Sequence, residues 1–332
     1  MQRAQQSIPK TDEDIQAYLD TITNKEKIII KPKFAQRYRT LTDYPLFMHY
    51  SLQYLRRAIR VNTLKVSVEE LKARLAKNFS LTPVPWCNEG FWIEHNEGRR
   101  DIGNTTEHAL GYIYIQEPAS MIPPIVLDPQ PEARVLDMCA APGSKTTQIA
   151  MYMQNRGVLV ANDFKVERIK PLGMNLQRMG ASNVIITLTE GHRLKNMQFD
   201  KILVDAPCTG TGTIRKSLRT LRIWNPNVVK RINAQQKQLI IAAYAMLKPG
   251  GTLVYSTCTL EPEENEGTIT HLLSQHTDAS LEEIALPIKR SAPIMSFEGQ
   301  VYHQEVSKCL RIWPQDNDTE GFFVAKVRKQ GC

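Results

Sequence analysis

From about residue 111 onward, short apolar runs alternate with longer segments of helical periodicity, and no other feature of the chain constrains its fold as much. The apolar runs predict strands at 135–137, 158–161, 184–186, 202–204, 251–254 and 322–327. The segments between them predict helices at 145–153, 167–179 and 233–246. Because these strands are apolar along their whole length, both faces of their sheet should be covered by helices. The alternation therefore predicts a doubly wound α/β sheet.

The N-terminal third of the chain does not show this alternation. Residues 1–50 mix aromatic with charged side chains and predict a mainly helical extension, whereas residues 51–112 predict a small α+β subdomain. The elements expected in this subdomain are a strand at 60–64, a helix capped by Ser67 and Glu70 with Leu71, Leu75 and Phe79 on one face, and a strand at 91–93. Such a unit is too small to fold alone, so it should pack on the larger domain at 113–330.

The charge balance and the cysteines limit the class of protein. The 332 residues include 42 Lys and Arg against 34 Asp and Glu, and this net charge of +8 favours a polyanionic partner. There is no stretch of about 18 apolar residues, and the first residues lack the apolar core of a secretion signal, so we predict a cytoplasmic protein without a membrane span. The six cysteines, which form no CxxC pair, are Cys87, Cys139, Cys208, Cys258, Cys309 and Cys332. We therefore expect reduced thiols and no metal site.

A loop of small residues follows the predicted strand at 135–137. Its sequence, DMCAAPGSKT, would let backbone approach a ligand closely, and the helix from Lys145 would point free N–H groups at it. The spacing fits neither GxGxxG nor a P-loop, and by itself a tight strand-to-helix turn would explain it. Asp163, at the end of the next strand, adds a carboxylate of the kind that accepts hydrogen bonds from ribose hydroxyls. Together these residues indicate a nucleotide-type cofactor.

Several other residues have less specific interpretations. Glu190 follows the third strand and either bonds the amine of an adenine or is an exposed turn residue. Lys165 and Arg168 follow Asp163 and are expected to be largely solvated. Cys139 is assigned to packing beneath the loop. Three tryptophans are expected to be structural: Trp86, Trp224 and Trp313. For Trp224, contact with RNA is the alternative.

Two cysteines each lie just past a predicted strand. Cys208 follows 202–204 in the segment DAPCTG, and Cys258 follows 251–254 in the segment YSTCT. The carboxyl ends of parallel strands share one edge of a sheet, which is where such folds place their chemistry. A lone cysteine there would be packing, but two, one of them three residues after Asp205, predict a nucleophile and an assistant.

The segments that follow the two cysteines add further expectations. The Gly- and Thr-rich segment that ends at Arg215 and Lys216 is expected to be a flexible loop that closes on a base and its phosphate. The acidic segment after Cys258 is expected to begin a helix whose dipole would stabilise a thiolate. Its acids are Glu263, Glu264 and Glu266.

From about residue 60 to residue 329 the chain resembles the RNA 5-methylcytosine methyltransferases, a family with bacterial rRNA enzymes, archaeal tRNA enzymes and eukaryotic NOL1/NOP2/SUN proteins. The motifs are DMCAAPGSKT, DAPCTGTGTIRK, YSTCTLEPEENE and GFFVAKVRK, with YIQEPASMIPP as a weaker one. The segments LRRAIRVNTLKVSVEEL and LTPVPWCNEGFWIE are most similar to the RsmF-type enzymes of small-subunit rRNA. The core is nearly as similar to the archaeal tRNA enzymes.

This resemblance implies a Rossmann-like, S-adenosylmethionine-dependent methyltransferase domain with an RNA-binding N-terminal subdomain. It makes Cys258 the nucleophile and Cys208 the residue that helps to release product, with Asp205 on the cytosine ring and Lys145 in the pocket. Glu190 stands where the family usually has Asp. The implied cofactor-binding residues are Cys139, Ala140, Ala141, Pro142, Gly143, Ser144, Lys145, Asp163, Arg168, Glu190 and Asp205.

The expected reaction is methylation of cytosine C5 in RNA, with 16S rRNA favoured and tRNA as the alternative. Addition of a thiolate to C6 would make C5 nucleophilic, and the base would have to leave its stack to be reached. A non-catalytic RNA-binding assembly factor is disfavoured because both cysteines and Asp205 are present, and a DNA or small-molecule methyltransferase by the second cysteine and the basic charge. We expect a monomer whose phosphate-binding patch includes Arg56, Arg57, Arg60, Arg215 and Lys216.

Overall fold

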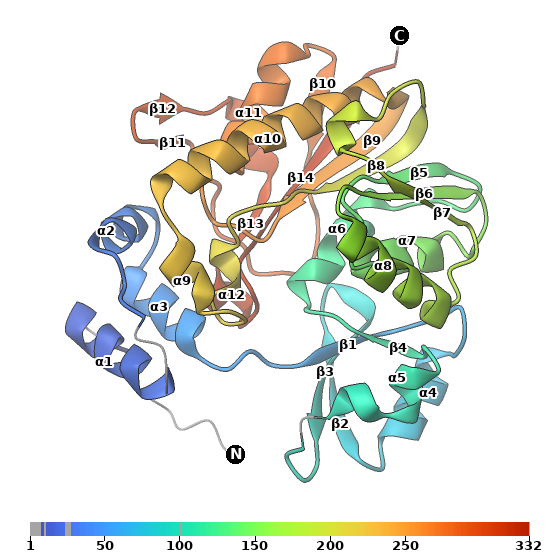
Figure 1. The fold of residues 1–332 in the computed structure, drawn as a ribbon, viewed down its shortest axis with the longest axis horizontal. Coiled ribbons are helices and arrows are strands. Elements are labelled where there is room, and N and C mark those ends of the chain that lie inside the picture. Colours follow the sequence, from blue (N-terminus) through green and yellow to red (C-terminus); the bar gives the residue numbers. More distant parts are fainter. Residues whose placement is uncertain (1–7, 10, 24–27, 100, 332) are drawn as a thin grey trace.

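The computed structural model describes residues 8–331 apart from 10, 24–27 and 100. A large sheet lies at the centre of the molecule, a smaller sheet lies below it in Figure 1, and the N-terminal helices pack at one side. The parts of the predicted extension at 1–7 and 24–27, and Cys332, lie outside the described residues. No helix of the described part is long and apolar enough to cross a membrane.

The large sheet has eight strands in the order β10-β14-β9-β8-β5-β6-β7, with β13 paired to β14. The strands are β5 Arg134–Asp137, β6 Val158–Asp163, β7 Val184–Leu188, β8 Phe199–Asp205, β9 Leu247–Thr257, β10 Ala279–Glu282, β13 Leu310–Ile312 and β14 Phe322–Lys329. Strands β5 to β9 pair in parallel, and β14 runs antiparallel to β9. The strand order reverses beside β5, because β6 lies on one side of it and β8 on the other. The predicted Rossmann-like fold is confirmed.

Helices cover both faces of this sheet, because neighbouring residues of its strands are buried on opposite sides. Val135 and Leu203 pack with α6 and α7, whereas Leu136 and Ile202 pack with α10 and α11. The helices around the sheet are α6 Ile122–Leu127, α7 Ser144–Tyr152, α8 Val166–Met179, α10 Pro226–Ala245 and α11 Glu266–Gln275. Helix α10 begins after an Asn225 cap, earlier than predicted, because that side chain accepts hydrogen bonds from the first turn.

The small sheet is antiparallel, in the order β2-β3-β1-β4. Its strands are β1 Ala58–Val61, β2 Phe79–Val84, β3 Cys87–His95 and β4 Ile113–Ile115, and helix α4 Val68–Leu75 packs on one face. Ser67 caps α4 as predicted, but the Glu70 carboxylate accepts from Arg74. The prediction that Phe79 continues the helical face is wrong, because Phe79 begins β2.

Arg60, predicted to bind phosphate, is instead fully buried between the small sheet and α7. Its guanidinium donates to the Ser144 carbonyl and the Thr147 hydroxyl, both at 2.8 Å, and to Gln148 at 3.3 Å. A buried guanidinium cannot reach an RNA backbone, so this prediction is wrong. Arg60 connects the two sheets through the helix that follows the predicted cofactor loop.

The N-terminal helices α1 Asp12–Ile22, α2 Pro32–Leu41 and α3 Tyr44–Leu52 form an aromatic core with later parts of the chain. Tyr38 lies between Phe34 and Phe47, and the Trp313 ring meets Tyr38 edge-on. Trp224 belongs to the same core and is 2% exposed, so its alternative role in RNA contact is excluded. The remaining short elements are α5 Thr106–Ala109, α9 Arg219–Ile223, α12 Pro314–Asn317, β11 Ser296–Phe297 and β12 Gln300–Val301.

Candidate active site

A cavity of about 440 Å³ lies where the carboxyl ends of β5 and β8 adjoin, beside the reversal of strand order. The loop after β5, the end of β8 and the start of β14 all contribute to its wall. Its lining includes most of the predicted site: Cys139, Ala140, Ala141, Pro142, Ser144, Lys145, Arg168, Asp205 and Cys258. The fold therefore brings together residues of the motifs DMCAAPGSKT, DAPCTGTGTIRK and YSTCTLEPEENE.

The predicted cofactor loop is held from below by Asp163, which is 1% exposed. Its carboxylate accepts a hydrogen bond from the Ala141 amide at 3.2 Å and forms an ion pair with Arg168 at 3.2 Å. Arg168 also donates to the Ala141 carbonyl, so it is not merely solvated as expected. Gly143, at φ +106°, completes the turn, and a Cβ there would lie 3.0 Å from the Leu172 side chain.

Glu190 lies apart from this cavity. It precedes a short 3₁₀ turn, is about half exposed, and forms an ion pair with Arg193 at 2.7 Å. His192 lies 3.5 Å from the same carboxylate. Cys139 does line the cavity, and burial together with Asp137 and Asp205 raises the pKa of its thiol well above the usual range, which keeps it protonated.

Lys145 and Asp205 form an ion pair at 2.8 Å on the cavity wall. Ser120 accepts from the same ammonium at 2.9 Å, and Ser256 donates to the other Asp205 oxygen at 2.8 Å. Burial lowers the pKa of Lys145, but the charge and hydrogen bond of Asp205 outweigh it and raise the pKa above the ordinary value. The pair therefore presents an ammonium and a carboxylate to the cavity.

The sulfurs of Cys208 and Cys258 lie 3.3 Å apart, with Cys258 lining the cavity. The hydrogen bond to Cys258, and then burial, raise the pKa of Cys208 well above its usual range. Cys208 therefore keeps its proton and can donate it towards the Cys258 sulfur. Two residues 50 positions apart in sequence thus share one hydrogen bond.

The segment after Cys208, expected to be a flexible loop, is packed tightly. Thr211 and Gly212 are buried, and the Gly212 amide donates to the Cys258 carbonyl at 2.9 Å. A Cβ on Gly212 would lie 2.2 Å from the Gly321 carbonyl oxygen, so only glycine fits there. Arg215, predicted to bind phosphate, has a fully buried side chain paired with Asp318 at 2.9 Å, and that prediction is wrong; Lys216 is exposed at the rim of the cavity.

Of the acidic segment after Cys258, only Glu266 begins a helix as predicted, because α11 begins at Glu266 and Glu263 and Glu264 precede it. Glu261, Glu264 and Glu266 are each fully buried. Glu261 pairs with Arg37 at 2.7 Å and Glu266 pairs with Arg311 at 2.6 Å, whereas Glu264 is bonded to Thr209. A run of acidic residues is typical of an exposed surface. Arg37 and Arg311, which pair with these acids, lie far away in sequence, so the sequence alone did not predict this buried cluster.

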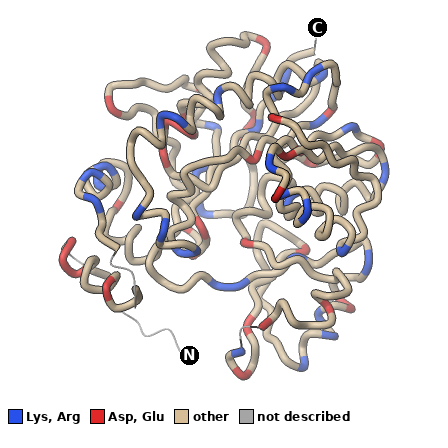
Figure 2. Tube along the Cα trace, viewed as in Figure 1, with Lys and Arg blue, Asp and Glu red and all other residues tan. Residues whose placement is uncertain are grey.

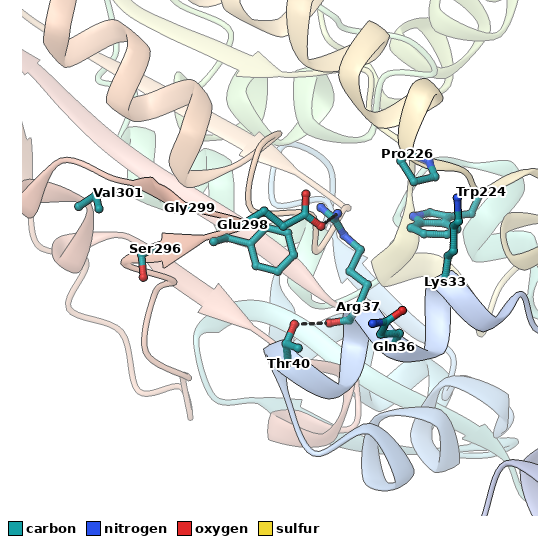
Figure 3. Close-up of a pocket in the computed structure, with 11 residues that line it drawn as sticks. Lys33, Gln36, Arg37, Thr40, Trp224, Pro226, Ser296, Glu298, Gly299 and Val301 are labelled. Carbon is teal, nitrogen blue, oxygen red and sulfur yellow. Dashed lines mark hydrogen bonds and ion pairs between the residues drawn. The ribbon is translucent and has the colours of Figure 1, made fainter.

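A larger cavity, of about 780 Å³, lies between α2, the start of α10 and the β11–β12 hairpin (Figure 3). It contains none of the predicted site residues. Arg37, which enters it from α2, is occupied by Glu261, Glu263 and Glu298, and its guanidinium lies over the Phe297 ring. The chemistry of the motifs therefore belongs to the smaller cavity.

Comparisons with known proteins identify the family of the chain. The family model for 16S rRNA methyltransferase RsmB/F matches residues 124–328, and that for the N-terminal domain of 16S rRNA methyltransferase RsmF matches residues 30–118. The tRNA (cytosine(49)-C(5))-methyltransferase of Pyrococcus abyssi is 48% identical over 90% of this chain and 96% of its own length.

Two further proteins are similar to most of this chain. Ribosomal RNA small subunit methyltransferase F of Shewanella denitrificans is 46% identical over 83% of this chain but 55% of its own length, so the chain spans about half of that relative. The crystal structure of a methyltransferase homolog protein from Pyrococcus horikoshii superposes with a TM-score of 0.81 at 38% identity, covering 95% of this chain and 98% of that one.

Proposed function

Because the chain belongs to the 16S rRNA methyltransferase RsmB/F family and is an S-adenosylmethionine-dependent RNA cytosine-5 methyltransferase, we propose that it acts through a covalent adduct between Cys258 and the target base. The observation that supports this most directly is the pair of sulfurs at 3.3 Å, of which Cys258 lines the cavity with Lys145 and Asp205. Cytosine C5 is a poor nucleophile, and a thiolate bonded to C6 removes that difficulty.

The residues of the site have complementary parts in this reaction. The Cys258 thiolate forms a bond to C6, and the electron pair of the C5–C6 double bond moves onto C5 and towards N3. The Lys145–Asp205 pair holds a proton that it can donate to N3, which stabilises the adduct. After C5 is methylated, water takes the C5 proton, the electron pair of that C–H bond re-forms the C5–C6 double bond, the S–C6 bond breaks, and N3 returns its proton to the Lys145–Asp205 pair. Cys208 assists this release by donating to the departing sulfur.

S-Adenosylmethionine supplies the methyl group when bound. The residues present fit it, because the loop from Cys139 to Lys145 is built of small residues and lines the cavity. Asp163, fixed beneath that loop, would accept bonds from the ribose hydroxyls once Arg168 yields part of its contact. Glu190 would serve the adenine only by turning away from Arg193, so its part is the weaker one.

The two thiols are tested by trapping. We expect Cys258→Ala to abolish methylation while cofactor binding persists, and Cys208→Ala to leave enzyme covalently attached to RNA. The attached species should survive a denaturing gel and disappear in the double variant. A trapped species in Cys258→Ala instead would reverse the two parts, and unchanged methylation in both variants would rule out covalent catalysis.

We propose small-subunit rRNA as the substrate, supported by the two matching family models, which together span residues 30–328. The second candidate is tRNA, and the specific observation in its favour is the 48% identity to the Pyrococcus abyssi tRNA enzyme over 96% of that protein. Purified enzyme should be incubated with small-subunit rRNA, assembled small subunits and tRNA, and bisulfite sequencing should locate the product. Modification of tRNA alone would replace the first candidate by the second.

The RNA is proposed to lie along a basic stretch that follows Asp205. Between Asp205 and Glu261 the chain contains no acidic residue. Besides the buried Arg215, the basic residues in this stretch are Lys216, Arg219, Arg222, Lys230, Arg231, Lys237 and Lys248. Lys216 lies at the cavity rim, and Arg219 and Arg222 are exposed on α9. Lys and Arg positions recur along α2, α9 and the segment before β1 (Figure 2). In that segment Arg57 is exposed, and the Arg56 guanidinium packs on the Trp92 ring.

A further inference from the structure

One buried carboxyl group contacts both cysteine-bearing segments. Glu264 accepts a hydrogen bond from the Thr209 amide at 3.0 Å, and its other carboxyl oxygen lies 2.5 Å from the Thr209 hydroxyl oxygen. The Thr259 hydroxyl lies 3.4 Å from the same carboxyl group. Thr209 directly follows Cys208 and Thr259 directly follows Cys258, so Glu264 contacts the residue next to each cysteine.

The two threonines are also bonded to each other. Their hydroxyl oxygens lie 2.8 Å apart, and the Thr211 hydroxyl lies 3.0 Å from that of Thr259. Gln236 closes the other side, because its amide donates both to Glu264 at 2.8 Å and to the Pro207 carbonyl at 2.9 Å. The peptide that carries Cys208 is therefore held on each side of the cysteine by groups bonded to one carboxyl.

The reaction needs this arrangement more at its end than at its beginning. Addition of Cys258 to C6 requires one sulfur near the base, whereas release requires the second sulfur close to the first. The 3.3 Å separation of the sulfurs depends on how the segment at 207–211 lies against the segment at 257–259. The contacts of Glu264 with Thr209 and Thr259 join these two segments directly.

We propose that Glu264 is a positioning residue that joins the Cys208 segment to the Cys258 segment and so sets the distance over which Cys208 assists product release. This inference rests on the proposed covalent mechanism. It assigns Glu264 no contact with the base or the cofactor. It predicts that loss of Glu264 slows the second half of the reaction while adduct formation persists.

The protonation of Glu264 makes the pH dependence of product release a test of this role, because a residue that only stabilised the fold would not change it. Burial raises the pKa of Glu264 to about 8, so the neutral acid prevails at pH 7. A neutral carboxyl can donate to the Thr209 hydroxyl through one oxygen and accept from the Thr209 amide and Gln236 through the other. A glutamine can reproduce all three bonds, with its amide nitrogen donating and its oxygen accepting. Above about pH 8 the glutamate loses its donor, whereas a glutamine keeps it.

The experiment compares Glu264→Ala and Glu264→Gln with the unaltered enzyme in single-turnover and steady-state reactions on the RNA that it methylates. For Glu264→Ala we expect a covalent complex that forms at a similar rate but decays at least about ten times more slowly. For Glu264→Gln we expect release close to normal at pH 7, and a release rate that no longer falls above about pH 8.

A matched control is Thr257→Val beside Thr209→Val. The Thr257 hydroxyl, on the other side of Cys258, donates to Asn265 at 2.6 Å rather than to Glu264. Thr209→Val should slow release as Glu264→Ala does, and Thr257→Val should leave the ratio of formation to release unchanged. Calorimetric cofactor binding and thermal unfolding verify that each variant is folded.

The outcomes separate this inference from the mechanism on which it rests. If Cys208→Ala traps no RNA, the parts proposed for the two cysteines fail, and the part proposed for Glu264 fails with them. If Cys208→Ala traps RNA but Glu264→Ala releases product at the normal rate, the positioning inference alone is overturned. A Glu264→Gln variant that shows the same decline above pH 8 as the unaltered enzyme would equally overturn it.

Discussion

At the scale of single residues, the charges of the site are compensated inside the protein. Asp205 is paired with Lys145, and Asp163 is paired with Arg168, each within 3.2 Å. A buried carboxylate without a partner would cost several kcal/mol, so these pairs allow acids to stand beside a cavity. A ligand that binds Asp163 or Asp205 must therefore replace part of the contact that this acid makes with its basic partner.

Asp163→Ala should weaken S-adenosylmethionine binding by about 1–3 kcal/mol, the usual loss for a hydrogen bond to a charged group. The Ala141 amide would lose its acceptor and Arg168 its ion pair, so the loop would loosen as well. Titration calorimetry measures the change. Glu190→Ala is the comparison and should cost less, because that carboxylate is half exposed and bonded to Arg193. Equal affinity in Asp163→Ala and the unaltered enzyme would remove Asp163 from the site.

At the scale of elements, the short helix α9 directly follows the part of the basic stretch that lines the cavity. Arg219 and Arg222 lie on it, and Lys216 precedes it. Trp224, directly after the helix, is buried in the aromatic core, so the position of α9 is fixed from beneath. A fixed row of cations beside a pocket can orient a phosphate backbone while the base enters.

The double variant Arg219→Glu with Arg222→Glu should weaken RNA binding and reduce the salt dependence of the affinity, because fewer counterions are released. Each lost phosphate contact should reduce the slope of log affinity against log salt by about one. Lys170→Glu, which reverses an exposed cation on α8, is the control. Filter binding at several salt concentrations measures both quantities, and an unchanged slope in the double variant would move the RNA away from α9.

Elements with strong apolar patterns were predictable, and elements defined by distant polar partners were not. The strands containing Leu136, Ile202 and Leu253 follow from continuous apolar runs, and the two cysteines follow from their places after such strands. The burial of Arg60 could not be foreseen, because three of its acceptors lie on α7, more than eighty residues away. The burial of Glu264 could not be foreseen for the same reason, because Thr209 lies in the loop after β8, 55 residues away.

At the scale of the whole molecule, pH should change stability through buried carboxyl groups. Burial raises the pKa of Glu264 to about 8, and burial with the neighbouring Glu320 raises the pKa of Glu117 to about 8. The unfolded chain releases these protons near pH 4.5, whereas the folded chain retains them until about pH 8. The free energy of unfolding should therefore fall as pH rises through this interval and level off above it.

Thermal unfolding without cofactor tests this between about pH 7 and pH 8.5. The lower end avoids His49, His108 and His271, whose pKa burial lowers and which act in the opposite direction below about pH 6.5. The unfolding midpoint should decrease across the range, and it should decrease less in Glu117→Gln. A midpoint that rises with pH over this interval would contradict the expected protonation.

The buried Arg60 also bears on how the gene can be divided. The two matching family models part between residues 118 and 124, but the guanidinium of Arg60 finds three of its acceptors on α7. A truncated product ending at residue 118 would lose these acceptors and would expose Trp86 and Trp92, which pack in one core with residues of α6 and α7. We expect the two halves to aggregate when produced apart and to become soluble only when they are synthesised together and can complement each other.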